Sequence, residues 1–307
     1  MKYLSWDIIV RDFKRNKYIY LMALPVLAYY ILFHYVPMYG AQIAFRDFVP
    51  VKGIYNSVWV GMKHFRLFFN GVYAWRLIRN TFLISFYNLI FGFPAPIILA
   101  LLLNEVGNPV FKRISQTLSY LPHFISMVVI ASLILTFTSS NGLVNDIIAF
   151  FLGESARGAL LLKPENFRAV YVVSDIWQGI GWGSIIYLAS IAGLDQEIYE
   201  AAFIDGASRF QRAIHITIPG ILPTVTILLI LRMGTLMNVG FEKVMLLYNA
   251  GIYETADVIS TYVFRRGILD TDWSFSAAVG LFNSLVNFTM VVTANWISRR
   301  VSETSLW

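Results

Sequence analysis

The sequence lacks cysteine and is poor in charged residues. None of the 307 residues is cysteine, which excludes disulfides, thiol catalysis and cysteine metal sites. Charged residues account for 14% of the chain, against roughly 25% in a typical soluble domain. Hydrophobic residues make up 57%, and the mean hydropathy is +0.63. This composition predicts an integral membrane protein.

The chain also lacks the motifs that organise common enzyme sites. It has no G-x-x-x-x-G-K-[ST] phosphate-binding loop, so we expect no ATP hydrolysis by this chain. It has no G-x-S-x-G or H-E-x-x-H pattern, and the four histidines are scattered, at positions 34, 64, 123 and 215. We therefore expect no catalytic residue, no metal site and no cofactor in this chain.

Positive side chains outnumber negative ones, and the net charge is +6. In a membrane protein, such an excess is typical of loops that face the cytoplasm and anionic lipid. We therefore expect contact with the lipid bilayer and no binding of nucleic acid.

Long apolar runs predict six membrane-spanning helices. Each run is close to the roughly 20 residues that a bilayer requires. The predicted fold is all-α, with the six transmembrane helices in a domain 18–297, a cytoplasmic segment 1–17 before it and a cytoplasmic tail 298–307 after it. The predicted spans are residues 18–38, 79–103, 118–138, 168–192, 218–240 and 276–297.

An even number of spans places both termini on one side of the membrane. The long loops 39–78, 139–167 and 241–275 then lie opposite the termini and opposite the shorter loops 104–117 and 193–217. Lysines and arginines are nearly balanced, with 11 on the terminal side and 10 on the other. The dense basic cluster before the first span places the termini in the cytoplasm by the positive-inside rule.

The polar loop between the fourth and fifth predicted spans contains signals of local structure. Asp195 is a favourable helix N-cap, and Gly206 is a natural left-handed helix stop. Ser208 and Gln211 form a capping-box pattern, which predicts a second short helix. The segment Thr217–Pro219 has the cap and first turn expected of the next long helix.

The same loop, residues 195–217, contains a spaced motif that extends into residues 218 and 219. Glu200-Ala201-Ala202 precedes Gly206, Ile216 and Ile218-Pro219, and the spacing matches E-A-A-x3-G-x9-I-x-L-P with isoleucine in place of the last leucine. The loop therefore resembles the EAA motif of the membrane subunits of type I ABC importers. In that family it is a cytoplasmic coupling helix that docks on the ATPase subunit. The resemblance implies that the coupling residues are Glu200, Ala201, Ala202, Asp205, Gly206, Ile216 and Pro219.

This resemblance also implies a multi-subunit assembly. A chain with one such loop and six spans is half of a translocation pathway and pairs with a homologous second permease subunit. A dimer of separate ATPase subunits binds ATP and Mg²⁺, and an extracytoplasmic substrate-binding protein delivers the substrate. The implied location is the bacterial cytoplasmic (inner) membrane, with a multi-pass chain and both termini in the cytoplasm.

Two other segments resemble a carbohydrate-transporting branch of the same family. YVPMYGAQIAFRDF (35–48) follows the first predicted span, and YLPHFISMVVIASLI (120–134) lies in the third. Both are similar to segments of importers related to polysaccharide and lipoprotein permeases. The implied function is the import of carbohydrate, as an oligosaccharide or a polysaccharide fragment.

The fourth predicted span suits either helix packing or contact with sugar. Gly179 and Gly183 form a G-x-x-x-G pair, and such small residues let helices approach closely. Aromatic and amide side chains in the same span offer flat apolar faces and hydrogen bonds, which sugars require. By position, the resemblance to maltose-type permeases implies a substrate path at Gln178, Gly179, Trp182, Asn238 and Gly240.

Two charged residues fall inside the predicted spans, Asp175 near the outer end of the fourth and Arg232 near the middle of the fifth. A charge in lipid is costly, so it predicts either a partner or an aqueous path. Either residue faces an aqueous path, or the two pair with each other. For Arg232, a position at a subunit interface or a cavity is favoured over exposure to lipid, and a role in binding acidic sugars is a further alternative. In the sixth span, Asn283 and Asn287 share one helix face, which suits hydrogen bonding between helices or contact with substrate.

Two other classes of protein are alternatives to an importer subunit. A secondary transporter driven by an ion gradient needs no ATPase and typically contains an internal repeat, which the sequence does not show. An intramembrane enzyme acting on lipid-linked sugars requires a cluster of catalytic carboxylates or histidines, and the sequence shows none. The favoured interpretation is therefore the permease subunit of an ABC importer.

Overall fold

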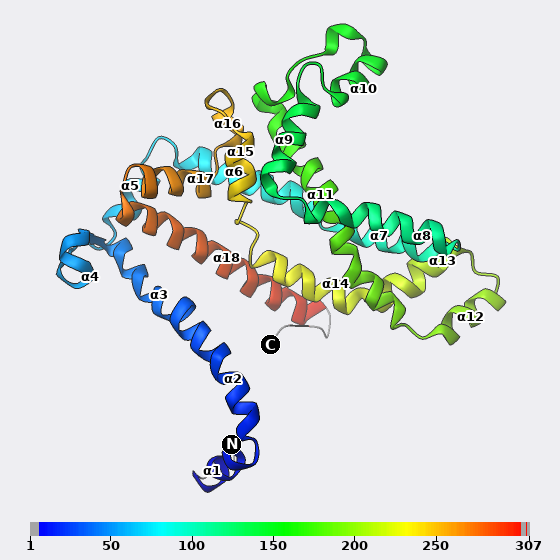
Figure 1. Cartoon of the computed structure of the whole chain (residues 1–307), viewed down its shortest axis with the longest axis horizontal. Helices are drawn as coiled ribbons and strands as arrows, with labels where there is room; N and C mark the ends of the chain where they lie inside the picture. Colours follow the sequence, from blue (N-terminus) through cyan, green and yellow to red (C-terminus); the bar gives the residue numbers. More distant parts are fainter. Residues whose placement is uncertain (1–5, 302–304, 306–307) are drawn as a thin grey trace.

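The computed structural model describes residues 6–301 and residue 305, and nearly every long segment in this part is helical (Figure 1). The strands found there are β1 (Arg46–Asp47) and β2 (Val58–Trp59), which form one short antiparallel pair. Helix packing therefore determines the fold, as the sequence predicts.

The helices form an N-terminal arm, a central bundle and a set of short connecting helices. The arm consists of α1 (Trp6–Arg15), α2 (Lys17–Tyr30) and α3 (Val36–Met38). The bundle consists of α6 (Ala74–Tyr87), α7 (Pro94–Glu105), α8 (Pro109–Tyr120), α9 (Met127–Thr138), α11 (Phe167–Ala192), α14 (Ile218–Met233) and α18 (Trp273–Val301). The short helices are α4 (Gly53–Asn56), α5 (Lys63–Phe69), α10 (Leu143–Leu152), α12 (Gln196–Ile204), α13 (Arg209–Arg212), α15 (Phe241–Leu247), α16 (Tyr253–Ala256) and α17 (Ile259–Phe264).

Five helical stretches of the described chain are long and apolar enough to cross a membrane. They overlap the first, second, third, fifth and sixth predicted spans. The fourth predicted span is one continuous helix of 26 residues, α11, but polar residues such as Arg168, Asp175 and Gln178 interrupt its apolar sequence. The five apolar stretches are Lys17–Phe45, Ala74–Glu105, Met127–Leu152, Arg209–Met233 and Trp273–Arg300.

The prediction of one helix over residues 118–138 is wrong. The chain bends between α8 and α9, where Leu121–Phe124 forms a 3₁₀ turn and Ile125 is extended with φ −80° and ψ 137°. Pro122 lies in this turn, and proline cannot donate the backbone hydrogen bond that a continuing helix requires. The third apolar stretch therefore begins with α9 and not at residue 118.

Three helices continue past a proline by widening one turn. The π-helical turns Ile31–Tyr35, Asn88–Gly92 and Ala213–Thr217 each end two residues before a proline. The residue just before each proline donates its N–H to the carbonyl five positions back. A proline ring crowds the carbonyl four residues earlier, and the wider turn provides room. The prediction that Thr217–Pro219 starts a new helix is therefore wrong, because α13 runs into α14 without a break.

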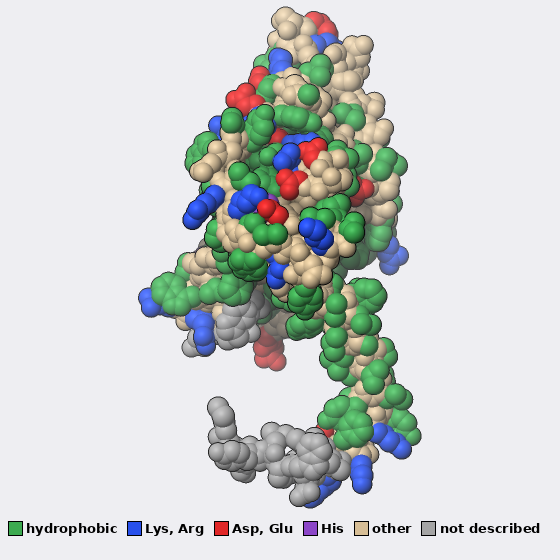
Figure 2. Space-filling view, turned by 90° about the vertical axis from the view of Figure 1, so that its left-hand side faces the viewer, with side chains coloured by type: hydrophobic (Ala, Val, Ile, Leu, Met, Phe, Trp, Pro, Cys, Tyr) green, Lys and Arg blue, Asp and Glu red, His purple; other side chains and the backbone are tan. Residues whose placement is uncertain are grey.

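The N-terminal arm stands apart from the bundle (Figure 1), and apolar side chains cover much of its surface (Figure 2). No residue of α2 or of the π turn Ile31–Tyr35 is buried. Large apolar side chains there, such as those of Met22 and Phe33, are 77% and 65% exposed. The arm therefore has an apolar surface that residues 6–301 leave uncovered.

Helix α11 is the centre of the bundle and contacts α7, α8 and α14. Around its N-terminal half, Phe167 packs with Ile84 of α6 and Ile130 of α9. Around its C-terminal half, Tyr187 packs with Ile221 of α14. Helix α11, with Asp175 within it, is therefore packed among the other helices of the bundle.

Glycines of α11 allow close approach to its neighbours at two levels. A side chain at Gly181 would collide with the backbone carbonyl of Ser119 on α8, and one at Gly183 would press on Pro96 of α7. Gly179 has open space beside it. Of the predicted G-x-x-x-G pair, only Gly183 is therefore a packing position, and Gly181 makes the closer contact.

We expect Gly181→Ala to lower the thermal unfolding temperature of the purified protein in detergent, because the added methyl group forces α8 and α11 apart. Overpacking of this kind costs about 1–3 kcal/mol. Gly179→Ala is the matched control, since this glycine lies in the same helix with no atom near its added methyl group. Equal unfolding temperatures for the two variants would mean that the contact between α8 and α11 relaxes freely.

Candidate functional site

A cavity lies beside α11, bordered by the π turn Asn88–Gly92, by α7 and by α14. Its volume is about 420 Å³, within the range of about 300–1,000 Å³ that is usual for ligand pockets. Apolar side chains form most of its wall, and a few polar ones interrupt them. The lining includes Asn88, Pro96, Asp175, Ile176, Leu228 and Arg232.

A second cavity of about 190 Å³ adjoins the first, and the two share Asn88, Asp175 and Arg232. We call the two together the central cavities. Asn238 and Gly240 also line the smaller one. Both intramembrane charges singled out in the sequence therefore lie where the two cavities meet.

Two residues of the predicted substrate path, Gln178 and Trp182, do not line the central cavities. The indole of Trp182 stacks instead on the ring of His123, with centroids 4.7 Å apart and planes 2° from parallel. The side of α11 that faces the larger cavity includes residues that recur every four positions, namely Asp175, Gly179, Gly183 and Tyr187. A helix turns 100° per residue, and Gln178 and Trp182, which directly precede Gly179 and Gly183, lie outside this lining.

Asp175 is held by an ion pair within this chain. Its carboxylate accepts hydrogen bonds from Nζ of Lys243 at 3.2 Å and from Nδ2 of Asn88 at 2.5 Å. Lys243 is 1% exposed and also donates to the backbone carbonyl of Tyr171 at 3.4 Å. A buried ion pair persists only where further hydrogen bonds satisfy both charges, and both partners have them here.

The alternative that Asp175 pairs with Arg232 is therefore wrong, because Lys243 is the partner. Sequence reasoning missed Lys243 because it placed the end of the fifth span at residue 240. Helix α14 ends at Met233, and the chain then turns back toward α11. Two glycines at positions 234 and 240 were the available signal for an irregular segment.

Asparagines of α18 hold this irregular segment, residues 234–240. Asn283 and Asn287 each donate through Nδ2 to Oδ1 of Asn238 at 3.0 Å, and the N–H of Met237 donates to Oδ1 of Asn287 at 2.9 Å. Irregular backbone at membrane depth is tolerated where it is buried in protein or lines a cavity. Of the two alternatives for the asparagine pair, the structure shows hydrogen bonding between elements.

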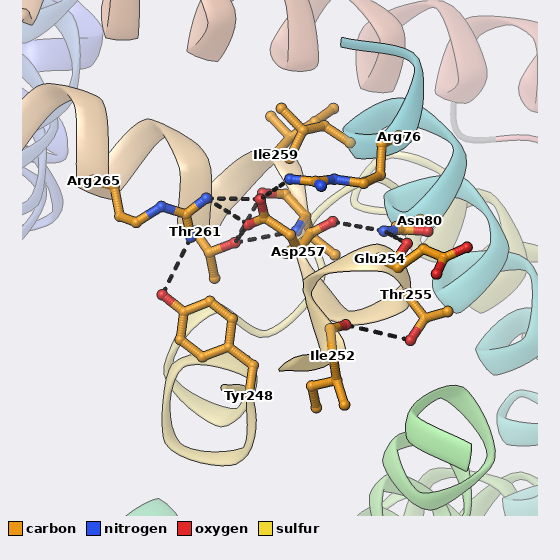
Figure 3. Close-up of polar contacts among 12 residues, drawn as sticks. Arg76, Asn80, Tyr248, Ile252, Glu254, Thr255, Asp257, Ile259, Thr261 and Arg265 are labelled. Atoms are coloured by element: carbon orange, nitrogen blue, oxygen red, sulfur yellow. Dashed lines mark hydrogen bonds and ion pairs between the residues drawn. The ribbon is translucent and has the colours of Figure 1, made fainter. Parts of the chain in front are cut away.

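A second polar cluster joins the long loops (Figure 3). Asp257 is fully buried and accepts hydrogen bonds from Nη2 of Arg265 at 2.7 and 2.8 Å, from Arg76 of α6 at 3.3 Å and from Thr261 at 2.9 Å. Burial alone would lower the pKa of Arg265, but its hydrogen bonds to Asp257 and Tyr248, together with the charge attraction of Asp257, outweigh burial and the pKa is raised. The cluster fixes the segment after α16 to the start of α6.

Further contacts group the loops as the sequence predicts. Two long loops meet where the hydroxyl of Thr255 donates to the carbonyl of Pro164 at 2.5 Å. The two shorter loops meet where Nη1 of Arg209 donates to the carbonyl of Glu105 at 3.3 Å. Long loops thus contact long loops, and short loops contact short loops.

The loop 195–217 forms two helical segments around Gly206. The carboxylate of Asp195 caps α12 by accepting from a backbone N–H at 2.9 Å. Gly206 has φ +77°, which favours glycine. Ser208 and Gln211 form the predicted capping box. Helix α12 has no buried residue and lies at the edge of the molecule (Figure 1).

Residues of the spaced motif lie on both sides of this turn. Glu200 is exposed on α12, whereas Ile216 is half-buried in the continuous helix that leads into α14. The apolar side chains of Phe203 and Ile204 are 69% and 83% exposed. The structure places the remaining motif residues on α12 (Ala201, Ala202), in the turn (Asp205, Gly206) and in α14 (Pro219).

These features define a helical, multi-pass membrane protein with cavities at the centre of its bundle and an exposed connecting helix at one edge. The family described as "Binding-protein-dependent transport system inner membrane component" matches residues 92–303. The match covers more than half of the chain. The chain belongs to this family.

Relatives and a solved structure match almost the whole chain. It is 43% identical over 307 residues to the protein LplB of Bacillus subtilis (strain 168), covering 100% of this chain and 95% of LplB. It is 44% identical over 294 residues to the polygalacturonan/rhamnogalacturonan transport system permease protein YteP of the same organism, covering 95% and 91%. A chain of a bacterial alginate ABC transporter, solved with an alginate pentasaccharide-bound periplasmic protein, matches with a TM-score of 0.87 and 41% identity, covering 96% and 99%.

We expect Asp257→Asn to destabilise the protein, because it leaves Arg265 and Arg76 without their shared counter-charge. Removing one partner of a fully buried pair costs about 3–5 kcal/mol, and the partial exposure of both arginines reduces this figure. The matched control is Asp270→Asn, which removes an exposed pair with Arg266 and costs about 0–1 kcal/mol. Thermal unfolding in detergent compares the two variants, and equal losses would contradict a structural role for the cluster.

Proposed function

We propose that this chain is the permease subunit of an ATP-driven importer of carbohydrate in the bacterial cytoplasmic membrane. The observation that carries the proposal is similarity over nearly the full length to permeases whose names specify polysaccharide transport, at 44% and 41% identity. Cavities with mixed apolar and polar walls at the centre of the bundle support a path for an oligosaccharide. ATP hydrolysis belongs to separate subunits in this proposal.

In this proposal α11 is a membrane span as well, the fourth along the chain, and it brings the five apolar stretches to a total of six spans. Its 26 residues give a length of about 39 Å at 1.5 Å per residue, which exceeds the roughly 30 Å of the hydrocarbon core. Its polar side chains are compatible with the membrane because other helices and the central cavities surround them. Both termini and the shorter loops then face the cytoplasm, and the contact between Arg209 and Glu105 supports that grouping.

The loop 195–217 is the coupling helix in this proposal and docks on an ATPase dimer that binds ATP and Mg²⁺. Helix α12 is exposed throughout most of its length, and Glu200 forms no ion pair within the described part of the chain. The exposed rings and aliphatic groups of Phe203, Ile204 and Phe210 form an apolar surface of the kind that marks a protein contact. An ion pair made by Glu200 and the packing of these apolar side chains would together hold the loop on the ATPase subunit.

Two further partners complete the assembly. The uncovered apolar surface of the N-terminal arm supports contact with lipid and with a homologous second permease subunit. The long loops, tied together through Asp257, present the surface on which an extracytoplasmic substrate-binding protein releases its sugar. This chain then supplies half of the translocation pathway.

Co-purification from the native membrane in mild detergent tests the proposed function. We expect a second permease and an ATPase to purify with the chain, and the ATPase activity to rise when a sugar-loaded binding protein is added. We expect Glu200→Arg to lose the ATPase but to retain the second permease, because the change reverses the charge on the coupling surface alone. A chain that purifies by itself, without any ATPase, would contradict the proposal.

Gly206→Val should lower sugar uptake, because a branched side chain is strained at φ +77° by about 1–2 kcal/mol and the turn beside α12 must change. Gly107→Val is the matched control, since that glycine also has open space around it but not a left-handed backbone. Uptake by proteoliposomes that contain the full transporter is the measurement. Wild-type uptake in both variants would remove the coupling role assigned to this turn.

A further inference from the structure

The central cavities carry a net positive charge. Asp175 and Arg232 are the acidic and basic side chains that line them, and Asp175 is already paired with Lys243. That pair is neutral as a unit, and Asn88 donates to the other carboxylate oxygen. The guanidinium of Arg232 therefore adds one positive charge that the lining does not compensate.

Arg232 has no counter-charge within the part of the chain that the structure describes. Its side chain forms no ion pair or hydrogen bond there, whereas Arg157 and Arg265 are each paired with carboxylates. Arg232 is also exposed. A cation at membrane depth that faces a cavity without a partner indicates contact with a substrate or an ion.

The pair between Asp175 and Lys243 sets the sign of this site. An unpaired Asp175 would cancel the charge of Arg232 and repel an anion. Lys243 neutralises the carboxylate from a position that is 1% exposed, and it is not part of the lining of either cavity. Among the residues that the structure describes, a substrate in the central cavities therefore meets one free cation, Arg232.

We infer that Arg232 binds a carboxylate of an acidic oligosaccharide, that is, of a chain containing uronate residues. This inference rests on the proposed function, in which sugar crosses through the central cavities. A guanidinium and a carboxylate form two parallel, charge-assisted hydrogen bonds. The single positive charge of one arginine matches the single negative charge of a uronate better than it matches a phosphate group, whose charge is about −1.5 to −2.

The rest of the lining suits the remainder of a sugar ring. Phe93 and Ile176 present apolar surfaces in the larger cavity, and Asn88 and Asn238 present amides in the smaller one. Pockets that orient a ligand typically combine an apolar wall with a few placed polar groups. Arg232 is therefore a specificity-determining residue that selects acidic over neutral sugars.

The experiment uses the complete transporter in proteoliposomes, with its binding protein, and compares Arg232→Gln, Arg232→Lys and Arg11→Gln. Uptake of two acidic trisaccharides, trigalacturonate and trimannuronate, is measured beside that of neutral maltotriose. We expect Arg232→Gln to lower acidic uptake roughly tenfold or more. Arg232→Lys should be intermediate, because lysine keeps the charge but not the bidentate geometry. Arg11→Gln, an exposed change on the arm, should match the wild type.

Each other outcome decides against the inference. Wild-type uptake of acidic trisaccharides by Arg232→Gln overturns it. A transporter that falls apart on size-exclusion chromatography after this change also overturns it, because Arg232 then pairs with another subunit. If the wild type transports maltotriose but neither acidic sugar, the inference fails and the proposed function stands. If the wild type has no ATPase partner or transports none of the three sugars, the proposed function fails first.

Discussion

The ion pair between Asp175 and Lys243 is the interaction on which the centre of this molecule depends. A carboxylate in the N-terminal half of a helix at the centre of the bundle is costly unless it is paired and hydrogen-bonded. Lys243 meets that need only because α14 stops at Met233 and the chain folds back over α11. The same turn brings residues 238 and 240 to the cavity wall. One pairing requirement therefore shapes both the path of the backbone and the charge of the central cavities.

Irregular backbone near the bundle centre is satisfied by side chains, since a bilayer supplies no water for it. After α14, the side-chain amide of Asn287 accepts a hydrogen bond from the backbone N–H of Met237, and the amides of Asn283 and Asn287 donate to the side chain of Asn238. At the prolines, a π turn lets the helix continue with one wider hydrogen bond. In both cases the backbone that departs from α-helical geometry keeps a hydrogen-bond partner. The irregular segments Asn88–Gly92 and 234–240 also both border the central cavities.

Local features were predictable from the sequence, and long-range ones were not. The caps at Asp195 and Ser208 and the left-handed Gly206 depend on atoms a few residues away, so composition and spacing suffice. The partner of Asp175 lies 68 residues further along the chain, and hydropathy alone cannot place it. The same limit applies to the predicted substrate path. Gly179 lies at the cavity wall as predicted, whereas Trp182, three residues further on, stacks on His123.

The coupling assigned in the proposed function has a direct structural route through this chain. The helix Arg209–Met233 is continuous; it starts at the turn after α12, and Arg232 in its last turn lines the central cavities. Its 23 steps from Arg209 to Arg232 span about 35 Å at 1.5 Å each. A continuous helix transmits a displacement with little loss, so in the proposed function a push on the loop 195–217 would move Arg232 as well as the helix wall. If Arg232 binds an anionic sugar as inferred above, moving this counter-charge would link ATP-driven motion to the affinity of the site.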